Sequence, residues 1–326
     1  MERAALAIVA VVGVPLALVG YLALGEFVLT RVPRPTGRRL RPWLWLGPAV
    51  SLLGLFLVYP TVQTAYLSFL DSASARPVGL ANYQQLLTDP SMGLALRNSL
   101  TWVVVFPLIT VVLGLAIALL ADRVPYDGAA RGVVFLPMAV SFVAAGVVWK
   151  LMFDYRPSTL EQTGLVNAVL MRLVPGFEPQ ASLVNGPPLN TLALIVAAAW
   201  VWTGFCTVVL SAALKGVPAE LLEAARVDGA SELQVVRHVV LPSLAPAIVV
   251  VVTTMIIFAL KAFDIVYVMT SGNYGTEVIA SRMYREMFNV RDFGRASAVA
   301  VMLLLAITPA MLLNIRRFRQ EGQAMR

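Results

Sequence analysis

Apolar runs long enough to cross a lipid bilayer recur along the whole of this chain. A helix needs about 20 mostly apolar residues to span the roughly 30 Å of a hydrocarbon core. Seven segments pass that length filter, at approximately 5–30, 43–70, 99–121, 132–153, 189–213, 243–270 and 297–315. Lipid offers no hydrogen bonds, so the backbone of each segment must satisfy itself, which only a helix achieves within one segment. The sequence therefore predicts an all-α integral membrane protein with seven spans.

Composition agrees with this prediction, because 59% of the residues are hydrophobic and only 13% are charged. Such a chain is too apolar for an ordinary soluble domain. The net charge of +7 comes from basic residues placed between apolar runs. That placement favours membrane orientation over binding of nucleic acid, with lipid as the surrounding solvent. The single cysteine, Cys206, lies inside an apolar run, so an intrachain disulfide is excluded.

The distribution of arginine and lysine predicts which loops face the cytoplasm, where basic residues near span ends are retained. One alternating set of loops carries 14 such residues, and the other carries 9 in a greater total length. The richer set consists of residues 31–42, 122–131, 214–241 and 316–326. We expect these loops inside, the N-terminus outside and the C-terminus inside.

The first apolar run differs from the others in its flanks. Residues 23–25 loosely resemble a signal-peptide cleavage site, but the run continues past Glu26 and five arginines follow between Arg31 and Arg41. These features predict a retained accessory span. The expected organisation is an N-terminal helix and Arg/Pro-rich linker at 1–42, a first core helix and outer loop at 43–98, and a core at 99–326. The outer loop at 154–188 could be an ordered cap or a mobile segment.

The loop from Gly216 to Pro242 contains signals for two short helices around a turn. Pro218 suits a first helical turn, and Gly229 suits a helix end that needs positive φ. Ser231 followed by Gln234 is a capping-box pattern for the second helix. Pro242 then predicts re-entry into the membrane.

The first of these helices presents small residues beside charges, with Ala224 and Ala225 next to Glu223. Another surface could approach closely there, which would make this helix a docking site. The alternative is a plain connector lying at the membrane interface. Local chemistry alone leaves both interpretations open.

A family pattern distinguishes them. Glu223-Ala224-Ala225, Gly229 after three intervening residues, and Val239 to Pro242 resemble the EAA motif of permease subunits of ATP-binding-cassette importers. Asp228-Gly229-Ala230 is similar to the sugar-permease form of that motif. Val239 stands where isoleucine is more usual, which is a conservative departure.

The resemblance implies a type I importer permease with six core helices and one additional N-terminal helix, in the inner membrane of a bacterium or archaeon. It implies that the 214–241 loop is a coupling helix, with Glu223 in charged contact with an ATPase and a turn at Gly229. The docking set it implies is Glu223, Ala224, Ala225, Asp228, Gly229, Leu241 and Pro242.

The implied partners are a second permease, an ATPase dimer and an extracytoplasmic binding protein, with a heterodimer of permeases favoured. The chain has no G-x-x-x-x-G-K-[ST] phosphate loop. ATP and Mg are therefore expected on the ATPase subunits, and no cofactor, metal or catalytic residue is expected on this chain.

Several short sequence segments, each a weaker signal than the EAA motif, occur in the order found in the sugar-permease branch related to maltose and glycerol-phosphate systems, which they resemble. They are Gly79 to Tyr83, Asp89-Pro90, Ala95 to Asn98, Phe135 to Pro137 before Trp149, Phe263-Asp264 before Thr270, and Gly294 to Ala298. Ser271 to Tyr274 departs from the Gly-Gly-Pro often found there, which leaves the shape of that loop open.

Ionisable groups within spans mark functional sites by default, because they are costly in lipid. Lys261 and Asp264, three residues apart in the sixth span, would share a helical face and could form a structural ion pair or line the substrate path. Sugars also need aromatic surfaces. Phe263, Tyr267 and Trp202 complete the predicted path, and Trp149, Trp200 and Phe258 are further aromatics near it. The lone histidine, His238, has no second histidine for a metal cluster.

The sequence thus predicts the membrane subunit of an ATP-driven importer that translocates a sugar, of di- or oligosaccharide size. Two alternatives belong to other classes. A secondary transporter would need coupling-ion carboxylates near mid-membrane, for which Asp264 is thin support. A membrane-embedded transferase would need a cluster of catalytic carboxylates or histidines at one interface.

Overall fold

The computed structural model describes the backbone of residues 2–324 and the side chains of residues 12, 13 and 15–312. Over that range the chain is helical, and the one β-type pairing is an isolated bridge between Leu70 and Pro77. The predicted all-α class is confirmed. Two compact units are distinguished, Met1–Tyr66 and Leu67–Arg326, and each is described by itself.

The first unit pairs helix α1 (Glu2–Thr30) with helix α2 (Arg34–Leu53), which continues through a π-helical segment (Gly54–Val58) into α3 (Tyr59–Leu67). Glu26 joins the pair, because its carboxylate accepts from Trp45 Nε1 at 3.0 Å and lies 3.0 Å from Arg41. The expected linker over residues 31–42 is only a turn at 31–33. Pro35 does not prevent helix there, because the first turn of a helix needs no amide hydrogen from that position.

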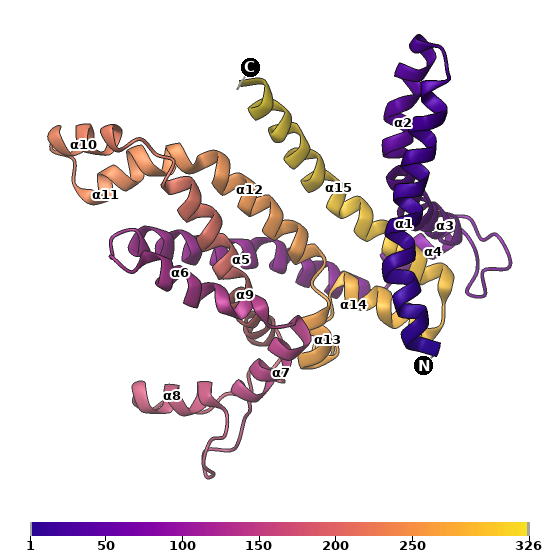
Figure 1. Cartoon of the computed structure of the whole chain (residues 1–326). Helices are drawn as coiled ribbons and strands as arrows, with labels where there is room; N and C mark the ends of the chain where they lie inside the picture. Colours follow the sequence, from indigo (N-terminus) through magenta and orange to yellow (C-terminus); the bar gives the residue numbers. More distant parts are fainter. Residues whose placement is uncertain (1, 325–326) are drawn as a thin grey trace. The chain divides into compact units, whose positions relative to one another are not determined.

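The second unit holds the remaining helices (Figure 1). They are α4 (Ala81–Thr88), α5 (Pro90–Ala121), α6 (Asp127–Phe135), η2 (Leu136–Ala139), α7 (Phe142–Met152), α8 (Leu165–Leu173), α9 (Leu189–Leu214), α10 (Ala219–Val227), α11 (Glu232–Val235), η3 (Val236–Val240), α12 (Leu241–Leu260), α13 (Asp264–Thr270), α14 (Ile279–Tyr284), η4 (Arg285–Val290) and α15 (Phe293–Ala324).

Within the described residues, five helices are long and apolar enough to cross a membrane. They are Arg34–Leu67, Pro90–Ala121, Leu189–Leu214, Glu232–Leu260 and Phe293–Leu312. The pair Asp127–Ala139 and Phe142–Met152 is a sixth candidate. The predicted first span, 5–30, falls within α1, but part of it lies outside the described side chains, so the count of seven and the orientation stay predictions.

Helix α9 lies at the centre of the second unit, packed between α5, α6 and α12. Small residues let the backbones meet, as is usual between membrane helices. A Cβ on Gly114 of α5 would lie 2.5 Å from the Cβ of Cys206, and one on Gly204 of α9 would lie 2.4 Å from the Val134 carbonyl oxygen of α6. The lone cysteine is therefore a packing residue at a helix crossing.

The predicted span at 132–153 is not a straight helix. Its two halves meet at a bend of 98°. Pro137 lies in the short 3-10 turn before the bend, where it has no amide hydrogen to continue an α-helix. Ser141 then begins α7 by accepting a hydrogen bond from the Ala144 amide at 3.2 Å. The sequence contained both signals, but the unbroken apolar run concealed them.

The loop between α7 and α9 is held by hydrogen bonds and close packing, which favours the ordered cap of the two alternatives for residues 154–188. Buried Asn167 on α8 donates to the carbonyls of Asp154 and Gln180 at 3.2 and 3.0 Å and accepts from the Gln180 amide at 2.9 Å. Gly164 packs against the Asp154 backbone so closely that a Cβ would meet its oxygen at 2.1 Å.

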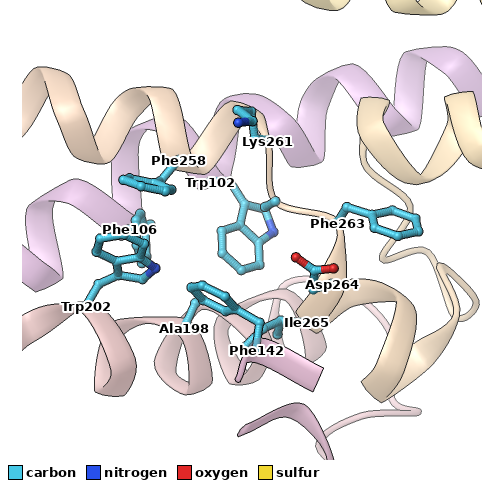
Figure 2. Close-up of a pocket in the computed structure, with 11 residues that line it drawn as sticks. Trp102, Phe106, Phe142, Ala198, Trp202, Phe258, Lys261, Phe263, Asp264 and Ile265 are labelled. Atoms are coloured by element: carbon cyan, nitrogen blue, oxygen red, sulfur yellow. The ribbon is translucent and has the colours of Figure 1, made fainter. Parts of the chain in front are cut away.

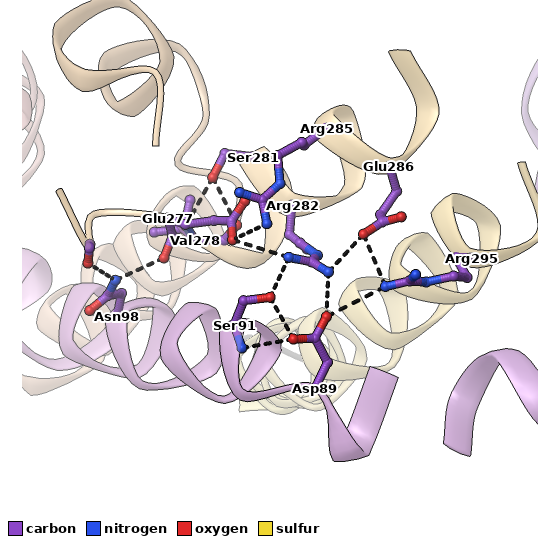
Figure 3. A network of polar contacts seen from close by, with 11 residues as sticks. Asp89, Ser91, Asn98, Glu277, Val278, Ser281, Arg282, Arg285, Glu286 and Arg295 are labelled. Carbon is purple, nitrogen blue, oxygen red and sulfur yellow. Dashed lines mark hydrogen bonds and ion pairs between the residues drawn. The ribbon is translucent and has the colours of Figure 1, made fainter. Parts of the chain in front are cut away.

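At the end of α5 remote from α6, a network of ion pairs joins the start of α5 to α14, η4 and α15 (Figure 3). Arg282, 4% exposed, donates to Asp89 at 2.5 Å and to Glu286 at 2.8 Å. Arg295 lies 3.2 Å from Glu286 and 3.5 Å from Asp89. Buried charges need such mutual pairing to offset their desolvation.

Four of the dispersed sugar-permease patches of the sequence meet at this junction, whereas Phe135 to Pro137 lies at the bend before α7 and Phe263-Asp264 at the start of α13. Asn82 donates to the Ser68 and Leu70 carbonyls at 2.8 and 2.7 Å, and a Cβ on Gly294 would lie 2.2 Å from the same Leu70 oxygen. Asn98 donates to the Gly275 and Glu277 carbonyls. These four patches therefore supply parts of a single junction between helices.

Candidate functional site

The loop between α9 and α12 forms a compact helical turn at one extremity of the second unit (Figure 1). Helix α10 ends in a Schellman motif: the Ala230 amide donates to the Ala225 carbonyl at 3.0 Å and the Gly229 amide donates to the Arg226 carbonyl at 3.1 Å. Gly229 has φ +83°, so the predicted glycine turn is confirmed.

Helix α11 begins with the predicted capping box. The Gln234 side chain accepts a hydrogen bond from the Ser231 amide at 2.7 Å and another from the Ser231 hydroxyl at 2.9 Å. Pro242 lies in the first turn of α12, where the sequence placed the start of the next span, although the helical stretch runs on unbroken from Glu232 to Leu260. Re-entry into the membrane at Pro242 stays a prediction. Pro242 cannot donate to the carbonyl four residues back, and the preceding turns relax into the π-helical segment η3.

The predicted docking residues divide into two faces. Glu223 and Ala224 are exposed, whereas Ala225 is half-buried against an apolar cluster formed by Leu214, Val235, Val240 and Leu244. Leu241 and Pro242 begin α12, beside the buried members of that cluster. The structure thus brings Glu223 to Gly229 together and places Leu241 and Pro242 on the helix that supports them.

Apolar side chains flank the exposed face of the loop, and sequence reasoning did not single them out. Leu221 is 50% exposed, Val227 86% and Leu233 77%. They lie on α10 and α11 around Glu223 and Ala224. A charged residue among exposed apolar ones is the composition expected of a protein contact surface.

Ion pairs connect this loop to the neighbouring α5–α6 turn. Glu232 pairs with Arg226 of the loop at 2.9 Å and with Arg123 of the turn at 2.9 Å. The hydrogen bond and charge of Glu232 raise the pKa of Arg226 above its ordinary value. Lys215 pairs with Asp127 of α6 at 2.9 Å. A displacement of the loop would therefore be transmitted to α5 and α6 as well as to α12.

A second site lies where the predicted sixth span is broken. Helix α12 ends at Leu260 and α13 begins at Asp264, so Lys261 and Asp264 flank a break and do not share a helical face. The expectation of an ion pair between them is wrong: no salt bridge joins them in the described part of the chain, and both side chains are exposed.

The break opens a pocket of about 150 Å³ whose walls come from α5, α7, α9 and α12 (Figure 2). Lys261, Phe263, Asp264 and Trp202 all line it, in agreement with their selection from the sequence. The Trp202 and Phe258 rings lie 3.8 Å apart between centroids, and Phe142 stacks on Trp202 at 5.8 Å.

Trp102, Phe106 and Phe142 also line this pocket, and sequence reasoning missed them. Figure 2 shows the Trp102 ring between Lys261 and Asp264. Its Nε1 is buried with no hydrogen-bond partner within the described residues. The signal was weak, because α5 is almost entirely apolar from Trp102 to Ala121 and nothing in that pattern identifies the side that meets α9 and α12.

The remaining candidates lie outside the pocket. Tyr267 stacks on Phe263 at 5.2 Å and contacts Tyr284 at 5.0 Å. Trp149 and Trp200 pack edge to face at 6.0 Å in a separate apolar cavity. His238 Nδ1 lies 3.1 Å from the Gln234 carbonyl oxygen, as a helix-surface residue.

Several helices long and apolar enough to cross a membrane, a capped helical loop between two of them and an aromatic pocket at a helix break are the features expected of a solute permease. The matching family model identifies the family: the chain belongs to the binding-protein-dependent transport system inner membrane components, with residues 110–315 matched. It is a multi-pass inner-membrane permease subunit of an importer, not itself an enzyme. The secondary-transporter and transferase alternatives are thereby set aside.

Two relatives and one solved structure illustrate the similarity. The chain is 50% identical over 278 residues to an osmoprotective compounds uptake permease of Synechocystis, covering 85% of this chain and 99% of that protein. It is 42% identical over 284 residues to an alpha-glucoside transport system permease of Rhizobium meliloti, covering 87% and 84%. A bacterial alginate ABC transporter, solved with its alginate pentasaccharide-bound periplasmic protein, matches with a TM-score of 0.73 at 22% identity, covering 89% and 98%, and shows the fold.

Proposed function

We propose that this permease imports an α-glucoside or a related small oligosaccharide through the pocket at the α12–α13 break. The observation that carries the proposal is the pocket's composition. Aromatic faces from four helices surround Lys261 and Asp264, which are not paired with each other. Sugars present apolar C–H faces and hydroxyl rims, so they require both kinds of surface. Tyr267 supports one wall through Phe263.

The pocket is small in the present conformation, and it would have to widen to take a hexose with its hydroxyls. A cavity of about 150 Å³ accommodates a ligand of the size of benzene. A disaccharide would then place one ring against Trp202 and Phe258 while the other extends along the path. The alpha-glucoside permease relative supports this substrate class.

The 214–241 loop is the proposed docking site for an ATPase that binds ATP and Mg. Glu223 and Ala224 would contact that subunit, with Leu221, Val227 and Leu233 around them. Asp228 and Gly229 shape the turn, and Leu241 and Pro242 transmit its movement to α12. Closure of an ATPase dimer would then move α12 and the helix break, which changes access to the pocket.

The other proposed partners are an extracytoplasmic binding protein and a second, different permease subunit. In this arrangement the loop faces the cytoplasm and the α7–α9 cap faces outward. The proposed organisation is an N-terminal helix and basic segment at 1–42, of which only 31–33 is non-helical among the described residues, a first core helix and outer loop at 43–98, and a permease core at 99–326.

Uptake of radiolabelled maltose, trehalose and sucrose by cells carrying the complete importer tests the substrate proposal. We expect saturable uptake of at least one sugar, reduced in Lys261→Gln and Asp264→Asn variants that still reach the membrane. Unchanged uptake in both variants would overturn the role of the pocket. Absence of uptake for all three sugars, with the binding protein stabilised thermally by none of them, would overturn the substrate class.

The docking proposal has its own test, which is co-purification of the ATPase with the permease. Glu223→Arg should abolish both association and uptake, whereas Glu161→Arg, a change in the α7–α9 cap, should leave both intact. Normal ATPase association in Glu223→Arg would contradict the docking assignment.

A further inference from the structure

A second cavity, of about 410 Å³, lies at the opposite end of α13 from the aromatic pocket. Asp264 and Ile265 at the start of α13 line the first pocket, and Met269 and Thr270 at its end line the second. Helix α13 has seven residues and is about 10 Å long, so the two cavities lie at its two ends. No part of the proposed function uses this second cavity.

Its lining has the composition of a carbohydrate site. Lys150, Asp154 and Tyr155 contribute from the end of α7 and the residues after it, and Asn273 and Tyr274 contribute from the loop after α13. Charged, amide and phenol groups can donate to and accept from hydroxyls. Tyr155 and Tyr274 are 43% and 53% exposed, so their rings are available to the apolar faces of a sugar.

The loop that carries Tyr274 holds an unfavourable backbone conformation. Tyr274 has φ +56° and Ser271 has φ +55°, a region that bulky L-residues avoid. Such strain persists only where the surroundings enforce it, and it concentrates at ligand sites. This is also the stretch where the sequence departs from the Gly-Gly-Pro pattern of the resembling family.

Two buried amides enforce that conformation. Asn190 of α9, fully buried, donates to the Tyr274 carbonyl at 2.7 Å. Asn98 of α5 donates to the Gly275 carbonyl at 2.6 Å and to the Glu277 carbonyl at 2.8 Å. The loop is therefore fixed to two core helices, with its tyrosine at the cavity.

The facing wall is fixed as well. The Asp154 carboxylate accepts from the Thr163 hydroxyl at 2.5 Å, and its backbone carbonyl accepts from Asn167 at 3.2 Å. Both sides of the cavity are thus held before any ligand arrives. Preorganisation of this kind lowers the entropic cost of binding.

From this geometry we infer a second carbohydrate-binding station, in which Tyr155 and Tyr274 contact a sugar ring and Lys150, Asp154 and Asn273 bind its hydroxyls. The station rests on the proposed sugar function and adds a site to it. Sugar would occupy this cavity before passing along α13 to the aromatic pocket. Residues of a chain-specific loop would then contribute to substrate choice.

Photolabelling of the complete importer in membrane vesicles tests the station. The probes are diazirine derivatives of maltose, trehalose and sucrose, with labelled peptides mapped by mass spectrometry. We expect labelling of the segments around 150–155 or 271–275, competed by the unmodified sugar, in addition to segments lining the aromatic pocket. Tyr155→Ala and Tyr274→Ala should each lower the labelling of the second cavity about two- to tenfold, which is the range for the loss of one aromatic contact.

Tyr274→Phe keeps the ring and should retain most of the labelling, and Tyr126→Ala, an exposed tyrosine beside α6, is the matched control without effect. Competed labelling confined to the aromatic pocket would overturn the station and leave the proposed function standing. If neither cavity shows labelling that the unmodified sugar competes away, both the second station and the proposed function are overturned. Equal loss of labelling at both cavities in Tyr274→Ala would also overturn the station, because it would indicate a general structural defect.

Discussion

Arg282 donates a 2.5 Å hydrogen bond to the carboxylate of Asp89, which lies 193 residues earlier in the chain. Asp89 also caps α5 by accepting from the Ser91 amide at 2.9 Å. One carboxylate therefore begins a membrane-crossing helix and fixes α14 beside it.

Asp89→Asn should destabilise the protein measurably. Breaking a fully buried ion pair costs about 3–5 kcal/mol. Asp89 retains 23% side-chain exposure and Arg282 keeps Glu286 as a partner, so we expect a loss of about 2–3 kcal/mol. Thermal melting of the purified permease in detergent measures it. Arg123→Ala, which removes an exposed ion pair, should lower the melting temperature less; an equal drop would contradict the assignment.

Stability should also depend on pH through Glu277. Burial raises the pKa of Glu277 above its ordinary value of 4.5, although Arg285 lies 3.1 Å away. The folded protein therefore favours the protonated carboxyl. Its contribution is fully present below pH 4.5 and is lost as the pH rises through the folded-state pKa.

Glu277→Gln removes this titration while keeping the shape of the side chain. The variant should melt at a higher temperature than the parent at pH 8, and the difference should shrink as the pH falls towards 4.5. Asp89 titrates in a lower pH range than Glu277. Burial raises the pKa of Asp89, but the hydrogen bonds from Ser91 and the charges of Arg282 and Arg295 outweigh that effect and hold this pKa below its ordinary value of 3.8. A parent-variant difference that does not change with pH would contradict the role of Glu277.

Two adjacent alanines of the proposed docking loop, Ala224 and Ala225, should respond differently to replacement by a larger side chain. Ala224 is exposed and Ala225 packs against the cluster around Leu214 and Val235. Ala224→Trp should therefore abolish ATPase co-purification without changing the melting temperature. Ala225→Trp should lower the melting temperature as well, because overpacking costs about 1–3 kcal/mol. Identical behaviour of the two variants would show that the loop packs differently.

Gly229 allows a comparison of backbone strain alone, since a Cβ there would meet nothing within 4 Å. Its φ of +83° makes Gly229→Ala cost about 1–2 kcal/mol, whereas Gly229→Asn should cost less because asparagine tolerates this region. We expect uptake to fall in the order glycine, asparagine, alanine. Gly128→Ala, a helical glycine with open space around it, is the control.

The sequence predicted the backbone of the loop between α9 and α12 closely because its signals are local. The Gly229 turn and the Ser231–Gln234 box depend on neighbours within a few residues, and both are present. The breaks at 136–141 and 261–263 were missed, because a hydropathy pattern gives the length of an apolar segment but does not show where its helix bends or ends. Pro137 indicated the first break, whereas nothing before Asp264 indicates the second.

The weak outer patches could not be interpreted from the sequence either. The structural role of these patches depends on contacts with backbone carbonyls elsewhere in the chain. Asn82 and Gly294 both meet the Leu70 carbonyl, and Asn98 binds that of Gly275. The same limitation hid Trp102. Its relevance comes from α9 and α12 packing around α5, which periodicity does not reveal in a stretch that is almost entirely apolar from Trp102 to Ala121.

Trp102→Phe should separate binding from packing in the aromatic pocket. Trp102 is 1% exposed and its Nε1 lacks a partner among the described residues, so phenylalanine removes an unsatisfied donor along with part of a ring. These effects oppose each other, and we expect a stability change within about 1 kcal/mol.

If Nε1 donates to a sugar hydroxyl, uptake efficiency should fall about two- to tenfold, the value of one hydrogen bond. Trp149→Phe is the matched control, because its Nε1 is equally unpartnered but lies in a different cavity. Equal loss of uptake in both variants would mean that the indoles only pack, whereas a loss confined to Trp102→Phe would place the sugar between Lys261 and Asp264.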